Sequence, residues 1–224
     1  MELRWALRIA AAAKCICTLF FIAAACSAPA RAAYSGLLII PTADIIEPNT
    51  YELNLQLDGN LAGRQGDTFI INTQHGISPR LEFGVDFDWS EFADNRIAVN
   101  FKYLAVTGTE TRPAVAFGVS GFGPYLKSNP YVAASHNLGA FRGHAGIIGT
   151  AGYARWFAGA DKALSGRLCL MAEHTNGEEN ASAVGISYSF TDRFNLTAGV
   201  IFPNRAEDSS RFSLQFIFSG SREE

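Results

Sequence analysis

The sequence predicts an all-β fold, a closed antiparallel transmembrane β-barrel of about 10–12 strands. The first observation is a two-residue hydrophobic period between Arg80 and Tyr103, which predicts a β-hairpin. The second is an alternation of short and long polar connections between such stretches, which is typical of outer-membrane barrels. The third is the composition of the opposite face. In the last strands this face often carries Gly, Ser or Ala, whose small side chains suit a crowded interior.

Residues 1–32 predict a cleaved secretory signal peptide. Basic residues occupy its start, residues 15–26 form its apolar core, and Ala30 and Ala32 offer small side chains at a cleavage site. Two alternatives stay open, a lipid-modified Cys26 and a single membrane anchor. For the anchor, the apolar run is short compared with the ~30 Å of hydrocarbon that it would have to span.

Charge and cysteine content narrow the class of protein. The predicted signal peptide carries one acidic and four basic residues, so its removal lowers the net charge from −3 to −6. This acidic balance argues against nucleic acid as a partner. Cys169 is the one cysteine outside the signal peptide, so an intramolecular disulfide is not expected.

The remaining chain divides into a lead-in, a barrel and a tail. Residues 33–50 form an N-terminal lead-in segment whose apolar run stops at Pro41, and residues 219–224 form a short C-terminal tail. The barrel is expected over residues 51–218. Its strands are expected at 51–59, 67–75, 80–89, 94–104, 112–120, 129–138, 142–150, 154–163, 167–175, 182–190, 193–202 and 210–218. The strands at 142–150 and 154–163 alternate poorly, and their merger would reduce the count to ten.

The connections predict which end of the barrel faces the periplasm. Those after the second, fourth, sixth, eighth and tenth strands are mostly short, whereas the others are longer and polar, apart from the one at residues 151–152. Short turns lie on the periplasmic side of outer-membrane barrels. The short connections end at Arg80, Arg112, Arg142, Arg167 and Arg193, which we interpret as strand-entry residues near the membrane interface.

The direction of the apolar face separates two folds. A soluble β-sandwich would bury this face, whereas a membrane barrel turns it toward lipid and encloses the polar face. Aromatic residues near the strand ends favour the barrel, because such residues gather at membrane interfaces. They are Tyr51, Trp89, Tyr103, Tyr131, Tyr153, Trp156 and Tyr188.

In a membrane barrel, the polar face of the early strands lines the lumen. The lumen-facing charged or polar residues are then Glu52, Asn54, Asp58, Glu82, Asp86, Asp88, Arg96 and Lys102. Charges enclosed in this way should be paired or hydrogen-bonded. They predict either a structural plug of ion pairs or a narrow conduit that prefers cations or hydroxyl-rich solutes.

The sequence offers little catalytic chemistry. Ser135 and His136 point to opposite faces of one strand and cannot bond each other, and Glu173 with His174 would need a serine from another strand. No nucleophile elbow, metal-ligand spacing or phosphate-binding loop is present in the sequence. We therefore predict no enzyme activity, no catalytic residues, no metal and no cofactor.

Two stretches carry a family resemblance. Gly36-Leu37-Leu38-Ile39-Ile40-Pro41-Thr42-Ala43 resembles the Gly-Leu…Pro-Thr-Ala opening of YjbH-like bacterial outer-membrane β-barrel proteins. The run from Phe157 to Val200, with RLCLMAEHTNG and SAVGISYSFTDRFNLTAGV, is similar to a strand–turn–strand passage of that family. His174 departs from it, standing where an aromatic residue is usual. The resemblance implies an outer-membrane barrel, linked in some members to exopolysaccharide production or secretion, and implies no catalytic residues.

We therefore expect a bacterial outer-membrane β-barrel protein with a structural or transport-associated role, linked to envelope exopolysaccharide production or export. The alternatives are a small porin-like channel for polar or cationic solutes and an outer-membrane lipid hydrolase. The expected partners are outer-membrane lipid and an envelope polysaccharide or its export machinery. The sequence does not determine the solute, the oligomeric state or whether the barrel is open or plugged.

Overall fold

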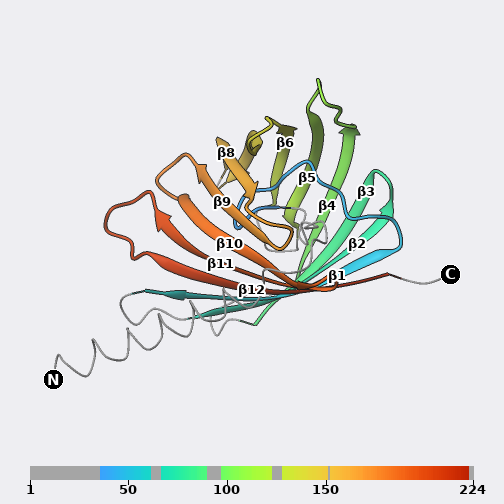
Figure 1. Ribbon diagram of the computed structural model, residues 1–224. Coiled ribbons are helices and arrows are strands. Elements are labelled where there is room, and N and C mark those ends of the chain that lie inside the picture. The colour runs from blue at the N-terminus through green and yellow to red at the C-terminus, as the bar shows by residue number, and fades with distance from the viewer. Residues whose placement is uncertain (1–35, 62–66, 90–96, 123–127, 151, 222–224) are drawn as a thin grey trace.

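The computed structural model describes residues 36–61, 67–89, 97–122, 128–150 and 152–221. Twelve strands close into one antiparallel barrel in which each strand pairs with its sequence neighbours and β1 pairs with β12 (Figure 1). They are β1 (Thr50–Asn60), β2 (Thr68–Ser78), β3 (Leu81–Asp88), β4 (Ile97–Val106), β5 (Ala114–Phe122), β6 (Asn129–Asn137), β7 (Arg142–Thr150), β8 (Tyr153–Ala163), β9 (Leu168–Thr175), β10 (Ala181–Thr191), β11 (Phe194–Pro203) and β12 (Arg211–Ser221). The described part of the chain contains no helix long and apolar enough to cross a membrane.

The predicted strands correspond to the observed ones in number and order. The two Gly- and Ala-rich segments form separate strands, β7 and β8, because they pair in continuous register from Arg142 with Asp161 to Thr150 with Tyr153. One boundary was wrong. β12 runs to Ser221, where it pairs with Thr50, so the first residues of the expected tail belong to the barrel. The predicted signal peptide and residues 222–224 lie outside the described residues.

The apolar side chains face outward, as a membrane barrel requires. Phe83 is 40% exposed and Phe216 is 37% exposed, although both lie in the middle of strands whose alternate positions are buried. Those alternate positions carry polar groups such as Glu82 and Gln215, which are buried inside the ring. Surrounding lipid stabilises the exposed apolar belt, and the enclosed lumen accepts the polar side chains. This direction excludes the soluble-sandwich alternative.

One predicted interface aromatic faces the wrong way. Tyr131 lies on the inward parity of β6 and is buried in the lumen. Its ring occupies the space beside Gly118 on β5, where a Cβ would come within 2.5 Å of the Tyr131 hydroxyl. A glycine on the neighbouring strand therefore makes room for this aromatic ring. The expected strand-end residues Tyr51, Tyr153 and Trp156 are exposed on the outside.

Candidate functional site in the barrel lumen

The lead-in segment folds back into the barrel. Residues 36–49 precede β1 and lie inside the ring of strands, where Figure 1 draws them in blue. They begin with a tight turn in which Gly36 bridges Pro41 and the Leu37 N–H donates to the Ile40 carbonyl at 3.0 Å. We call residues 36–49 the lumenal segment. Leu37, Leu38 and Ile40 are buried, so its tip is a compact apolar wedge.

The wedge packs against one wall of the lumen. Its three buried side chains join a cluster formed by Tyr131, Ala133, Phe157, Met171, Ala183 and Ile201, which come from β6 and β8–β11. Gly159 and Gly199 leave the space that this packing needs. A Cβ on Gly159 would lie 2.6 Å from Ile40 Cδ1, and a Cβ on Gly199 would collide with Leu38 Cδ2. The small residues of the inward face are therefore a seat for the lumenal segment.

Polar side chains of the wall satisfy the backbone of the wedge. The Glu173 carboxylate on β9 accepts hydrogen bonds from the N–H groups of Ile39 at 2.8 Å and Ile40 at 3.0 Å. From β12, Gln215 Nε2 donates to the Leu38 carbonyl at 3.3 Å. A buried backbone without partners would be costly, so these side chains act in place of a neighbouring strand.

A second set of anchors holds the segment closer to the short-turn end. The guanidinium of Arg142 on β7 donates two hydrogen bonds to the Asp44 carboxylate. Lys102 on β4 donates to the Asp44 carbonyl at 2.9 Å and lies 3.3 Å from Glu82, which accepts from the Ile46 N–H at 3.0 Å. Burial would raise the pKa of Asp44, but the hydrogen bonds and charge of Arg142 outweigh it and hold that pKa below its usual value.

Arg142 corrects an interpretation made from the sequence. It was grouped with the arginines that begin strands near the membrane interface, yet its guanidinium points inward to Asp44. A planar guanidinium and a carboxylate form paired hydrogen bonds, which explains why arginine suits this anchor. The sequence showed both residues but no signal that brings positions 98 residues apart into contact.

A Ser–His–Asp chain lies beside this anchor. Ser135 Oγ is 2.8 Å from His144 Nδ1, and His144 Nε2 is 2.6 Å from Asp161 Oδ1. As the sequence predicted, Ser135 does not bond His136, because its partner is the residue opposite it on β7. The register of the two strands around their short turn was the signal that could have found His144.

In this structure the Ser135–His144–Asp161 hydrogen-bond series helps to hold the lumenal segment. Ser135 is 3% exposed, and its Oγ accepts the Ala43 N–H at 2.9 Å. The hydroxyl that would attack a substrate is therefore covered by the segment. The other expected pair is split, because Glu173 points into the lumen whereas His174 does not. His174 bonds Ser182, a serine from β10, at 2.9 Å, and its ring lies 5.1 Å from that of Trp156 at a tilt of 56°.

The predicted lumen residues lie on the wall opposite the wedge. Glu52, Asn54 and Asp58 on β1, Glu82 on β3 and Lys102 on β4 are buried, and Asp86 and Asp88 are half-buried on β3. Arg96 lies outside the described residues. The structure brings Glu82 and Lys102 into an ion pair, and Asp86 accepts a hydrogen bond from Asn100 at 2.6 Å. Glu52 accepts from Ser219 at 3.3 Å.

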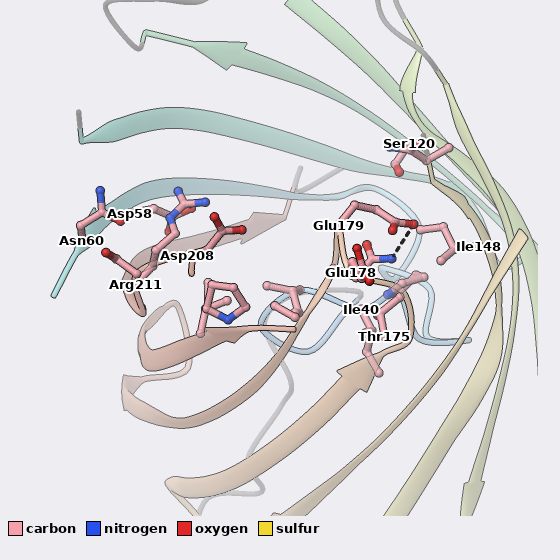
Figure 2. A pocket seen from close by; sticks show the side chains of 18 residues that line it. Ile40, Asp58, Asn60, Ser120, Ile148, Thr175, Glu178, Glu179, Asp208 and Arg211 are labelled. Carbon is pink, nitrogen blue, oxygen red and sulfur yellow. Dashed lines mark hydrogen bonds and ion pairs between the residues drawn. The ribbon is translucent and has the colours of Figure 1, made fainter. Parts of the chain in front are cut away.

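Two cavities flank the lumenal segment. The larger has a volume of about 620 Å³ and opens among the long loops, where Asp58, Asn60, Asp208 and Arg211 gather on one side and Glu178 and Glu179 on the other (Figure 2). The hydrogen bonds from Arg155 hold the pKa of Glu179 below its usual value. The smaller cavity, of about 340 Å³, lies against β1–β5 and is lined by Gln56, Asn72, Gln74, Asp86 and Asn100, among others. Ile39 and Pro41 line both cavities, so the segment separates them.

The described lumen is acidic. Its inward carboxylates are Asp44, Glu52, Asp58, Glu82, Asp86, Asp88, Asp161 and Glu173, and its inward bases are Lys102, Arg142 and, at the mouth, Arg211. The three bases each lie next to one of these carboxylates. Acidic side chains therefore outnumber basic ones on the described inward face.

The closed barrel with an apolar outside and a polar, partly filled lumen defines the chain as a bacterial outer-membrane β-barrel protein. No family model matches the sequence, and no curated protein is similar to it. Its fold is similar to that of a solved KdgM porin, with a TM-score of 0.59 and 11% sequence identity over 75% of this chain and 98% of the porin. A KdgM porin solved in complex with disordered oligogalacturonate gives a TM-score of 0.54 and 9% identity over the same shares.

Proposed function

We propose that the protein is a porin-like outer-membrane channel whose lumen is narrowed by its own lumenal segment, and that it passes cationic or uncharged hydroxyl-rich solutes. The observation that carries this proposal is the pair of cavities, about 620 and 340 Å³, that flank the segment within one acidic lumen. The porin-like fold supports a channel. The acidic and amide side chains on the β1–β4 wall support cationic or hydroxyl-rich molecules as the transported solutes.

The acidic lumen also argues for a substrate unlike that of one structural neighbour. Oligogalacturonate, which a KdgM porin binds, is a polyanion. Here the inward bases Lys102, Arg142 and Arg211 are engaged with carboxylates, so an anionic chain would meet uncompensated like charge. Any polysaccharide that enters this lumen is therefore uncharged or cationic.

Conductance across a planar bilayer tests the proposal. The purified full-length chain should produce discrete currents, and in a potassium chloride gradient the reversal potential should show selectivity for the cation. Asp58→Asn should reduce this selectivity, whereas Glu207→Gln, which changes an exposed loop carboxylate, should not. Absence of currents above background would leave a structural role only, and anion selectivity would contradict the assigned solute class.

We also propose a role in an envelope exopolysaccharide system. The support is the resemblance to YjbH-like proteins, whose opening motif here forms the tip of the lumenal segment. Cells that lack the protein should then lose surface polysaccharide, and the intact gene should restore it. A variant that locks the barrel shut should fail to restore it if the channel itself is the exporting element. Unchanged surface polysaccharide in the deletion strain would end this part of the proposal.

A further inference from the structure

Arginine residues recur at the short-turn end of the barrel, just before strands begin. We call four of them, Arg80, Arg112, Arg167 and Arg193, the arginine collar. Arg80, Arg167 and Arg193 immediately precede β3, β9 and β11, and Arg112 lies on the short connection between β4 and β5. Short turns lie on the periplasmic side of outer-membrane barrels, so the collar marks the periplasmic mouth.

The backbone ladder gives Arg193 an inward position at this mouth. The carbonyl of Arg193 accepts the Ser219 N–H at 2.9 Å, so these two residues lie opposite each other, one position beyond the pair of Phe194 and Phe218. Residues directly opposite in an antiparallel pair point to the same face. Ser219 is on the inward face, because its hydroxyl donates to the buried Glu52. Arg193 therefore shares the inward face.

The same argument applies to Arg167 and Arg80. The Arg167 carbonyl accepts the Ser189 N–H at 2.8 Å, and Ser189 has the inward parity of β10. The Arg80 carbonyl accepts the Leu104 N–H at 2.8 Å, and Leu104 has the inward parity of β4. Three collar arginines thus occupy positions that face the axis of the mouth and not the surrounding lipid.

The collar differs from the bases of the lumen and of the long-loop end in its charge partners. Ion pairs with carboxylates engage those other bases, which are Lys102, Arg142, Arg155, Arg205 and Arg211. Within the described part of the chain, no carboxylate forms an ion pair with a collar arginine. Arg167 is half-buried and the other three are exposed, so a partner from solution can reach them.

The periplasmic mouth is positively charged in spite of nearby acids. The described acids at this end are Glu47, Glu110 and Asp192, and the collar together with Lys162 at the end of β8 outnumbers them. The lumen behind the collar is acidic. The sign of the charge therefore reverses between the mouth and the lumen.

This reversal selects the kind of partner. Guanidinium groups form paired hydrogen bonds with carboxylates and phosphates. Phosphates of the surrounding lipid would meet arginines that face outward, whereas three of these positions face inward. An anionic solute in transit would have to pass from the collar into an acidic lumen. An anionic partner that stays on the periplasmic side meets neither obstacle.

We propose that the arginine collar docks an extended acidic segment of a periplasmic protein at the mouth of the barrel. Arg167 and Arg193 precede strands that are two positions apart in the sheet, which corresponds to about 10 Å. An extended peptide spans this distance in about three residues, so a run of acidic residues places carboxylates on successive arginines. The inference does not depend on the channel function, because docking requires no current.

A fluorescent decaglutamate peptide tests the proposal, with a decaglutamine peptide as its uncharged control. Binding to the purified full-length chain in a nonionic detergent is measured by fluorescence anisotropy. The glutamate peptide should bind at least about tenfold more tightly than the glutamine peptide, and added salt should weaken its binding, as expected of exposed charges. Equal binding of the two peptides would overturn the proposal.

Two competitors distinguish a protein segment from other anions. They are a galacturonate oligomer of the same charge and phosphatidylglycerol. Each should displace the labelled peptide only at a higher concentration than unlabelled decaglutamate does. Displacement by the oligomer at a lower concentration would assign the collar to an anionic saccharide. Displacement by the lipid at a lower concentration would assign it to headgroups, and either result would overturn the proposal.

Variants locate the binding on the collar. Arg167→Gln with Arg193→Gln removes two neighbouring charges, and Arg80→Gln with Arg112→Gln removes the other two. Each double variant should lower the affinity for decaglutamate at least about fivefold. Arg205→Gln is the matched control, because Arg205 is 48% exposed and lies at the long-loop end. Unchanged affinity in either double variant, with a barrel verified by heat-modifiable mobility on a gel, would assign the binding elsewhere and overturn the proposal.

Discussion

Replacing Gly199 with valine should open the channel. Gly199 lies on the inward face of β11, where any Cβ collides with Leu38 Cδ2 at the tip of the lumenal segment. Leu38 is 4% exposed and belongs to the apolar cluster that seats the segment. The added isopropyl group therefore disfavours the docked state of the segment. It also meets the Val184 carbonyl oxygen of β10, which lies 2.8 Å from the Cβ position, so barrel formation must be verified separately.

The size of the effect follows from overpacking. Extra carbon atoms in a packed core cost about 1–3 kcal/mol. Because about 1.4 kcal/mol changes an equilibrium tenfold, the population of the undocked segment should rise roughly 5- to 150-fold. The hydrogen bond that Glu173 accepts from the Ile39 N–H and the one that Gln215 donates to the Leu38 carbonyl would weaken together with the packing, so the upper part of this range is expected.

Single-channel recording measures the change as open probability. Ala198→Leu is the matched control, because it adds three carbons to the same strand at the adjacent position, which faces away from the lumen. Heat-modifiable mobility on a gel verifies that both variants form barrels. Equal open probabilities in folded Gly199→Val and Ala198→Leu would refute the idea that the packed wedge restricts the channel.

Three further changes test the polar anchors of the lumenal segment by the same recording. Because the pKa of Asp44 in the folded protein lies below its usual 3.8, its contribution to docking is complete above that value and is lost as the pH falls through the folded pKa. Open probability should therefore rise in acid. Asp44→Asn should raise the open probability at neutral pH by about fivefold, a modest effect because the ion pair with Arg142 is one-third exposed. The same variant should show a smaller response to acid. Glu173→Ala removes the two carboxylate oxygens that accept the Ile39 and Ile40 N–H groups and should destabilise docking by about 1.5–3 kcal/mol. Glu173→Gln keeps one acceptor and should cost less; equal effects would contradict the assigned hydrogen bonds. Ser135→Ala leaves the Ala43 N–H without its acceptor and should cost about 1–3 kcal/mol of docking, while an unchanged open probability would show that this bond is not an anchor.

The sequence by itself determined the barrel. The alternation of apolar and polar residues is a local property of each strand, and it predicted ten to twelve strands and the apolar face of most of them, although Tyr131 proved to face inward. Connection lengths fixed which ends carry short turns. The lumen-facing positions of Glu52, Asp58 and Glu82 follow from parity alone once the apolar face is known to meet lipid.

Only the tertiary structure decided what fills the lumen. The lead-in segment shows no alternation of apolar and polar residues. The residues that anchor it, Glu173, Arg142 and Ser135, lie 92 to 134 residues away in the sequence. Strand periodicity predicts that a side chain points inward. It does not predict which residue lies across the barrel from that side chain. Contacts across an enclosed space depend on the closure and register of all twelve strands together, so the seat of the segment could not be predicted from local patterns.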